Sequence, residues 1–246
     1  NPAIYINIEI SPDNKYLLTE RIDKPFSYLV PAGGFKSTIY VTDITGKLVK
    51  EIAKIPSSEL APSGFDNVLN APRGHQWLNN QPATLTWIEP LDSGLIKKNV
   101  EYHDAAYSLS SPFSGQPKQL AKTVMRMRSI SDINEEIFLV TEYSQAKHRT
   151  KTSKLNPLTG AQEVIIDRST DDAYNDPGTP VTEKNKYDRN SIRLVNGTQM
   201  LMRGAGSSPK GDLPFLSTFD INTKESKMLW RCESPYYESV VSIVDF

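Results

Sequence analysis

The stretch Ser37-Thr-Ile-Tyr-Val-Thr-Asp-Ile-Thr-Gly-Lys-Leu-Val-Lys-Glu-Ile52 decides the fold, because two segments with alternating apolar positions flank the turn Asp43-Ile-Thr-Gly46. Such alternation is typical of strands with one buried face, and a short polar turn with glycine joins two strands into a hairpin. A second hairpin signal precedes it, since Ser11-Pro-Asp-Asn-Lys-Tyr-Leu-Leu-Thr-Glu-Arg-Ile22 is a turn that leads into a strand. Residues 4–54 therefore predict four consecutive strands in one small antiparallel sheet.

This pair of hairpins recurs along the chain. The first signal, a polar turn with asparagine before alternating apolar residues, returns at residues 78–89, 132–143 and 194–203. The second signal, a turn that starts on Asp, Asn or Ser and ends near Gly or Lys, returns at residues 106–115, 153–160 and 218–224. A small antiparallel sheet repeated in tandem indicates a β-propeller.

The repeats are longer than compact blades. The turn asparagines Asn14, Asn80, Asn134 and Asn196 are 66, 54 and 62 residues apart, whereas a compact blade takes roughly 40–50 residues. We therefore expect insertions in the stretches rich in Pro, Gly, Ser and Asp, which are residues 23–36, 56–73 and 169–186. The one helical candidate is a single turn near residues 57–60.

The expected fold is all-β, a partial β-propeller of about four four-stranded blades plus the first strand of a fifth. The approximate blades are residues 1–56, 57–122, 123–168 and 169–235, and residues 236–246 would begin the next blade. Because a single strand without a partner leaves backbone groups unpaired, we expect the chain to be a piece of a longer protein.

Composition limits the classes of function. The 246 residues carry 28 basic and 29 acidic side chains, a net charge of -1, so no global field would attract nucleic acid or an anionic membrane. The single cysteine, Cys232, excludes an internal disulfide framework and a zinc site with several cysteines. No apolar window is long enough to span a bilayer. The sequence begins without Met, which suggests that a segment was removed upstream, and an exported or periplasmic location is favoured over the cytoplasm.

Motifs for catalysis, metals or cofactors are missing. There is no Gly-x-Ser-x-Gly, and Gly204-Ala-Gly-Ser-Ser208 has the wrong spacing for a nucleophile elbow. The three histidines show no ligand spacing, so we expect no metal and no cofactor. The basic groups Lys118, Lys122, Arg126 and Arg128 are interpreted as solvated edges, not a nucleic-acid surface.

The most distinctive stretch is residues 71–94, which places large side chains with polar tips in the first and second strands of one blade. Inner strands line the central channel of a propeller, so some of these side chains could face a ligand. They could equally be structural, with the tryptophans packing between blades and the arginine pairing with a carboxylate. The residues concerned are Arg73, His75, Trp77, Trp87 and Glu89.

Several motifs, taken in order, resemble the prolyl oligopeptidase family of serine peptidases and are closest to its glutamyl endopeptidase branch. These motifs are Ser11-Pro-Asp-Asn-Lys-Tyr, Arg21 with Pro25-Phe-Ser-Tyr-Leu-Val-Pro31, Pro72-Arg-Gly with Trp77, Pro82-Ala-Thr-Leu-Thr-Trp, Glu89-Pro-Leu-Asp-Ser-Gly94 and Asp176-Pro-Gly. The resemblance covers the propeller half of such an enzyme and none of its α/β-hydrolase domain, which carries the catalytic triad.

The resemblance implies a non-catalytic propeller that admits oligopeptides to a hydrolase domain, so the chain alone should have no peptidase activity. If the parent prefers glutamyl peptides, Arg21 and Arg73 are the candidates for binding a carboxylate, because a guanidinium matches a carboxylate bidentately. The alternative is a stand-alone β-propeller that binds a protein or glycan partner. The expected partners are a peptide substrate, through the missing domain, and other copies of the fragment through open sheet edges.

Overall fold

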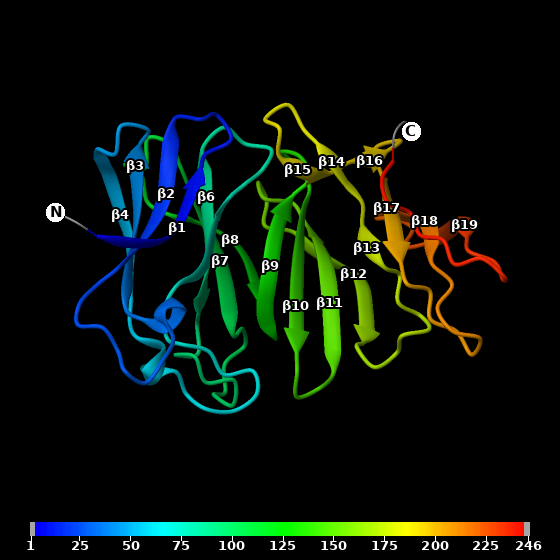
Figure 1. Cartoon of the computed structure of the whole chain (residues 1–246), viewed down its shortest axis with the longest axis horizontal. Coiled ribbons are helices and arrows are strands. Elements are labelled where there is room, and N and C mark those ends of the chain that lie inside the picture. Colours follow the sequence, from blue (N-terminus) through cyan, green and yellow to red (C-terminus); the bar gives the residue numbers. More distant parts are fainter. Residues whose placement is uncertain (1–2, 244–246) are drawn as a thin grey trace.

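Short antiparallel strands dominate the structure, a computed structural model that describes residues 3–243 (Figure 1). The first sheet contains β1 (Ile4–Ile10), β2 (Tyr16–Ile22), β3 (Ser37–Asp43) and β4 (Leu48–Ile55). The second contains β5 (Arg73–Trp77), β6 (Thr84–Pro90), β7 (Asp104–Ser110) and β8 (Lys118–Thr123). The third contains β9 (Arg126–Asp132), β10 (Phe138–Ser144), β11 (Arg149–Leu155) and β12 (Gln162–Ser169).

The fourth sheet is irregular. Its main path is β13 (Thr179–Pro180), β17 (Gln199–Gly204), β18 (Phe215–Asp220) and β19 (Ser226–Arg231), and β16 (Leu194–Val195) also pairs with β17. A separate hairpin of β14 (Thr182–Lys184) and β15 (Asn190–Ile192) is inserted between β13 and β16. The only helical turns among the described residues are Ala32–Gly34 and Ser58–Leu60.

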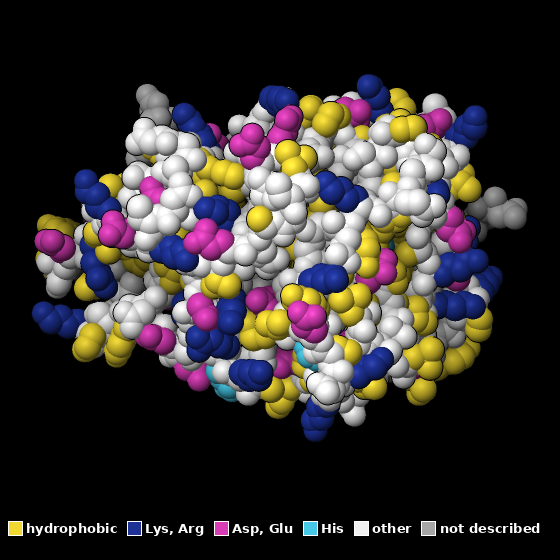
Figure 2. Space-filling view, turned by 180° about the vertical axis from the view of Figure 1, so that it is seen from behind, with side chains coloured by type: hydrophobic (Ala, Val, Ile, Leu, Met, Phe, Trp, Pro, Cys, Tyr) yellow, Lys and Arg dark blue, Asp and Glu magenta, His cyan; other side chains and the backbone are white. Residues whose placement is uncertain are grey.

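The predicted all-β propeller fold is confirmed. In each of the first three sheets the strands pair in sequence order, and the sheets follow one another across the molecule, with the first and the fourth at opposite ends (Figure 1). The described part of the chain contains no helix long and apolar enough to cross a membrane. Acidic and basic side chains are interspersed over the back of the molecule (Figure 2), in keeping with the net charge near zero.

The turn residues explain the register. Asn196 and Gly197 both have positive φ, 51° and 78°, as the central residues of the turn closed by the bond from the Thr198 N–H to the Val195 carbonyl, between β16 and β17. At the turn between β1 and β2, the Ser11 hydroxyl accepts hydrogen bonds from the backbone N–H groups of Lys15 and Tyr16.

The start of a fifth blade is not seen. Residues 239–243 form no strand, and residues 244–246 lie outside the described part of the chain. In the described region this segment is held by Arg203, whose guanidinium donates to the carbonyls of Val240 and Val241 at 3.2 and 3.1 Å. A strand needs a neighbouring strand to satisfy its backbone groups, and among residues 3–243 no strand pairs with this segment.

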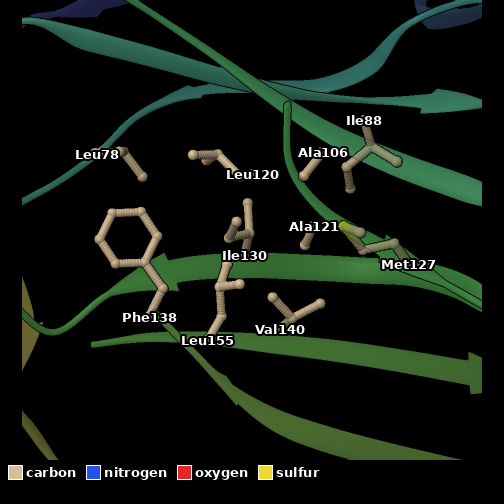
Figure 3. Packing of buried hydrophobic residues seen from close by; sticks show 10 residues of the cluster. All are labelled: Leu78, Ile88, Ala106, Leu120, Ala121, Met127, Ile130, Phe138, Val140 and Leu155. Atoms are coloured by element: carbon tan, nitrogen blue, oxygen red, sulfur yellow. The ribbon is translucent and has the colours of Figure 1, made fainter. Parts of the chain in front are cut away.

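Apolar side chains fill the space between successive sheets. Leu18, Ile39 and Val41 of the first sheet meet Trp77 and Trp87 of the second. Between the second and third sheets, Phe138 and nine other buried side chains form one cluster (Figure 3). A third cluster, which includes Met200 and Phe219, joins the third and fourth sheets. Strand alternation produces this arrangement because each sheet presents an apolar face to a neighbour.

Replacement of Phe138 tests the packing between the second and third sheets. Phe138 is 1% exposed, and Phe138→Ala should lower the free energy of unfolding by about 3–5 kcal/mol because it leaves a cavity in this cluster. Urea denaturation of the two proteins measures the difference. Tyr28→Ala, at a fully exposed aromatic residue, is the control and should change stability by no more than about 0.5 kcal/mol. Equal effects of the two substitutions would contradict the packing described.

Candidate functional site

The first strands of three successive sheets lie side by side and define the inner side of the propeller. The Trp77 indole N–H donates to the carbonyl of Glu9 at 3.1 Å, which joins β5 to β1. The Gln76 amide donates to the carbonyl of Ile130 at 2.8 Å, which joins β5 to β9. Polar side chains on these strands are therefore close enough to share one site.

A cavity of about 300 Å³ lies against these strands, and we call it the inner pocket. Glu9, Gln76, Asn79 and Asp132 contribute polar groups from the inner strands and the turn after β5. Thr182, Asn190 and Ser191 of the β14–β15 hairpin also line it. The pocket is thus formed by strands of the first three sheets together with a hairpin inserted in the fourth.

The β14–β15 hairpin is held over the inner pocket by amide hydrogen bonds. The Asn79 amide donates to the carbonyl of Asn190 at 2.8 Å, and the Asn80 amide donates to the Ser191 hydroxyl at 2.7 Å. In the opposite direction, the Asn185 amide donates to the Asn79 carbonyl at 2.7 Å and to the Asn80 side-chain oxygen at 3.0 Å. The guanidinium of Arg189 reaches further and donates to the carbonyl of Ile10. We refer to these contacts as the asparagine latch.

Burial alters the two carboxyl groups of the inner pocket. It raises the pKa of Glu9 above its ordinary value, although the positive charge of Arg189 opposes the shift. It also raises the pKa of Asp132, even though the carboxylate accepts backbone N–H bonds from Asn79 and Asn80 at 2.9 and 2.7 Å. The pocket therefore offers hydrogen-bond acceptors in a partly desolvated setting, which favours ligands with N–H donors or a positive charge.

The two arginines predicted to bind a carboxylate lie on different faces. Arg21 of β2 binds Asp23 at 2.8 Å and lies over the Tyr40 ring, on the face of the first sheet turned away from the second. Arg73 of β5 binds Asp104 at 2.5 Å and the carbonyl of Met127 at 3.3 Å, between the second and third sheets. They are therefore not positioned to bind the same carboxylate.

The other predicted residues lie on the face of the second sheet toward the first. Trp77 and Trp87 pack in the cluster between these sheets, as the structural interpretation expected. The ring of His75 stacks on Trp87, with centroids 6.1 Å apart, and Glu89 accepts the Trp87 indole N–H at 2.7 Å. His75, Trp87 and Glu89 thus form a contiguous group, and Arg73 is on the opposite face of the same sheet.

A buried ion network lies between the second and third sheets. Arg126, which is 2% exposed, donates to Asp92 at 2.6 Å and to Asp104 at 3.0 Å, and both aspartates are fully buried. His103 contacts the same oxygen of Asp92 at 2.7 Å, and Arg126 also donates to the other Asp92 oxygen at 3.1 Å. Arg73 binds the oxygen of Asp104 that Arg126 leaves free. The interpretation of Arg126 as part of a solvated edge is wrong, because the two aspartates and the carbonyl of Asp66 occupy its guanidinium.

The network also sets the protonation of Asp92. Burial alone would raise the pKa of this carboxyl, but the hydrogen bonds from Arg126 and His103 and the charge of Arg126 hold the pKa below its ordinary value. Asp92 is therefore ionised at neutral pH and compensates the charge of Arg126.

Sequence reasoning missed the asparagine latch, Asp132 and the ion network. The signal for the latch in the sequence was the Asn79-Asn80 pair, because adjacent asparagines offer two side-chain amides. On the sequence alone this pair indicates only a turn, where asparagine is common. The described residues hold no group of three or more His, Cys, Asp or Glu suited to a metal ion.

Removing Arg126 should destabilise the protein strongly and in a pH-dependent way. Arg126→Met leaves the buried Asp92 without its arginine and Asp104 with Arg73 as its remaining cation, so the free energy of unfolding at pH 7 should fall by about 3–5 kcal/mol. Without the guanidinium the pKa of Asp92 rises, so the folded variant takes up a proton that the wild type does not. The difference in the free energy of unfolding between the wild type and Arg126→Met should therefore shrink as the pH falls from 7 toward about 4.

Urea titrations at several pH values test this expectation. Arg21→Met is the matched control, because its ion pair with Asp23 is partly exposed, and it should cost no more than about 1 kcal/mol. A deficit for Arg126→Met that is small, or that does not vary with pH, would contradict the network.

His75 should remain neutral over most of the pH range. Burial lowers its pKa to about 4, and the buried Nε2 atom has no hydrogen-bond partner in the part of the chain that the structure describes. In the unfolded chain a histidine titrates near about 6.5, so the folded state should lose stability as the pH falls through this value toward 4. Ring resonances of His75 followed by NMR should not shift between about pH 8 and pH 5. A titration midpoint above pH 6 would show that the ring is accessible to water.

Comparison with known proteins adds independent information. No family model matches the chain. It is 33% identical over 252 residues to the probable glutamyl endopeptidase, chloroplastic, of Oryza sativa subsp. japonica, and 33% identical over 253 residues to the protein of the same name from Arabidopsis thaliana. Both matches take in 99% of this chain but only 27% and 26% of the relatives, so the chain spans about a quarter of their length.

Among solved structures, a β-propeller, oligogalacturonate lyase in complex with manganese, matches with a TM-score of 0.51 and 10% identity, and the match covers 97% of this chain and 56% of that one. At this identity the likeness concerns the fold alone. The sequence relationship to the plant proteins covers nearly the whole chain. The predicted resemblance is therefore confirmed: this chain is a β-propeller that is similar, over nearly its whole length, to about a quarter of two plant proteins named glutamyl endopeptidase.

Proposed function

We propose that this chain is the non-catalytic, substrate-gating propeller of a serine peptidase that acts on oligopeptides. The observation that carries the proposal is the 33% identity to glutamyl endopeptidases over 99% of the chain. In this proposal the catalytic triad belongs to an α/β-hydrolase domain of the parent protein, and the chain by itself hydrolyses no peptide. Open sheet edges would also allow the isolated chain to associate with other copies.

The asparagine latch supports a gating role. The hairpin contacts the turn after β5 and the end of β1 mainly through amides, a hydroxyl and a guanidinium. Such hydrogen bonds can be exchanged for bonds to water at a small net cost. The hairpin can therefore leave the inner strands by exchanging these polar bonds, and the contact of Ile192 of β15 with the apolar cluster between the third and fourth sheets favours its return.

The inner pocket suits a peptide backbone. Its carboxylates and amide oxygens can accept hydrogen bonds from peptide N–H groups or from a protonated amino group. A preference for glutamyl substrates is supported by the two plant relatives, because both are named glutamyl endopeptidases. If Arg21 or Arg73 binds a glutamyl carboxylate, that carboxylate must displace Asp23 or Asp104.

Weakening the latch in the full-length peptidase tests the proposal. Asn80→Ala combined with Asn185→Ala removes three of the amide hydrogen bonds, so the hairpin should be open for a larger fraction of time. We expect kcat/KM for a long peptide to rise about fivefold relative to that for a short chromogenic peptide.

Asn222→Ala is the matched control, because this asparagine binds Lys154 away from the latch. Its ratio of long to short peptide hydrolysis should equal that of the wild type. An unchanged ratio in the latch variant would contradict gating by the hairpin. If the full-length protein cleaved no peptide at all, the chain would instead be a stand-alone propeller that binds a protein or glycan.

A further inference from the structure

A second cavity lies on the outer side of the molecule, between the second and third sheets. It has a volume of about 570 Å³, and we call it the outer cleft. All of β8 forms one wall, and Glu142, Ser153 and Val164 of the third sheet form the floor. The turn at residues 157–160 lines it as well. The buried cluster of Figure 3 joins the two sheets as far as Leu120 and Ala121 of β8 and Leu155 of β11, and it contains no residue of the outer strand β12.

The wall of the outer cleft is a free sheet edge. On one side β8 pairs with β7, from Asp104 opposite Thr123 to Ser108 opposite Lys118. On the other side no described strand pairs with it, because β8 is the last strand of its sheet. Backbone N–H and C=O groups along such an edge are available to an added antiparallel or parallel strand.

The floor contains an unsatisfied polar group among apolar side chains. Ser153 is 1% exposed, and its hydroxyl has no hydrogen-bond partner in the described structure. Buried hydroxyl groups are nearly always paired, so this one marks a position where a ligand group can bind. Val164, Val124 and Leu158 line the same cleft and are 40%, 49% and 70% exposed. An added strand would cover these apolar side chains.

The accessible charge of the cleft is positive. Lys118 donates to the carbonyl of Pro157 at 2.7 Å, and Lys122 lies over the Tyr102 ring, so both ammonium groups are placed beside the free edge. The one carboxylate on the floor, Glu142, is 4% exposed and accepts the Met125 backbone N–H at 2.8 Å. A partner strand with acidic side chains complements this arrangement.

We propose that the outer cleft binds an extended peptide segment of a partner protein, which adds as a fifth strand beside β8 and carries acidic and apolar side chains. This binding site is independent of the inner pocket and of the proposed peptidase function. The apolar side chains of the segment pack on Val164 and Leu158, and its acidic side chains contact Lys118 and Lys122.

The probe for this site is a fluorescein-labelled peptide in which glutamate and valine alternate over seven residues. Fluorescence anisotropy with the full chain should show saturable binding, and amide hydrogen exchange of residues 118–123 should slow in the complex. The charge reversal Lys118→Glu with Lys122→Glu should weaken binding at least about tenfold. Val164→Glu, on the floor of the cleft, should also weaken binding. Because Val164 is 40% exposed, this substitution removes no buried side chain.

Two controls separate strand addition from charge attraction alone. Lys50→Glu with Lys54→Glu places the same change on β4, the outer strand of the first sheet, and should leave the affinity unchanged. A peptide of the same sequence with N-methylated backbone amides should not bind, because it cannot donate to the sheet edge. The proposal is overturned if the methylated peptide binds equally well, if neither cleft variant weakens binding, or if no saturation is found up to about 1 mM. The proposal is also overturned if light scattering shows dimers of the chain that persist in excess peptide, because a second copy would then occupy the free edge of β8.

Discussion

The guanidinium of Arg126 is the contact on which the middle of the molecule depends. It lies at the start of β9 and binds Asp92 and Asp104, which flank the loop between β6 and β7. It also donates to the carbonyl of Asp66, whose side chain in turn accepts hydrogen bonds from Ser144 and from the backbone of Gln145 and Ala146. One buried cation thus ties the third sheet to the loop between β6 and β7 and to the connection between β4 and β5. Because a buried charge is tolerated only when it is fully paired, these loops have little freedom to rearrange.

The interface between the second and third sheets differs between its inner and outer sides. On the inner side, hydrogen bonds from Gln76 and Trp77 hold β5 beside β9 and β1, and the inner pocket forms between them. On the outer side, the sheets diverge beyond Leu120 and Ala121, and the outer cleft remains open. The β14–β15 hairpin is connected to the inner strands by the polar contacts of the asparagine latch, and it is therefore the element best suited to move.

The sequence predicted the features that depend on neighbouring residues. The alternation in residues 37–52, the Asn196-Gly197 turn and the Ser11 turn each specify a local conformation, and the strands lie where these signals indicated. Contacts between residues far apart in the sequence could not be predicted from such local signals. The partners of Arg126 are 34 and 22 residues away, and those of Asn185 are more than 100 residues away, so no local pattern marks them. The prediction for Arg73 succeeded in part, because the structural interpretation foresaw a carboxylate partner without identifying it as Asp104.

The central claim is that a movable hairpin over the inner strands controls access for peptides. Hydrogen exchange of residues 182–192 in the full-length protein, with and without a bound oligopeptide inhibitor, tests it most directly. The account predicts that these amides exchange much faster than those of the core strand β10 and that their rates change when the peptide binds. Exchange as slow as in β10, and unaffected by the peptide, would contradict it.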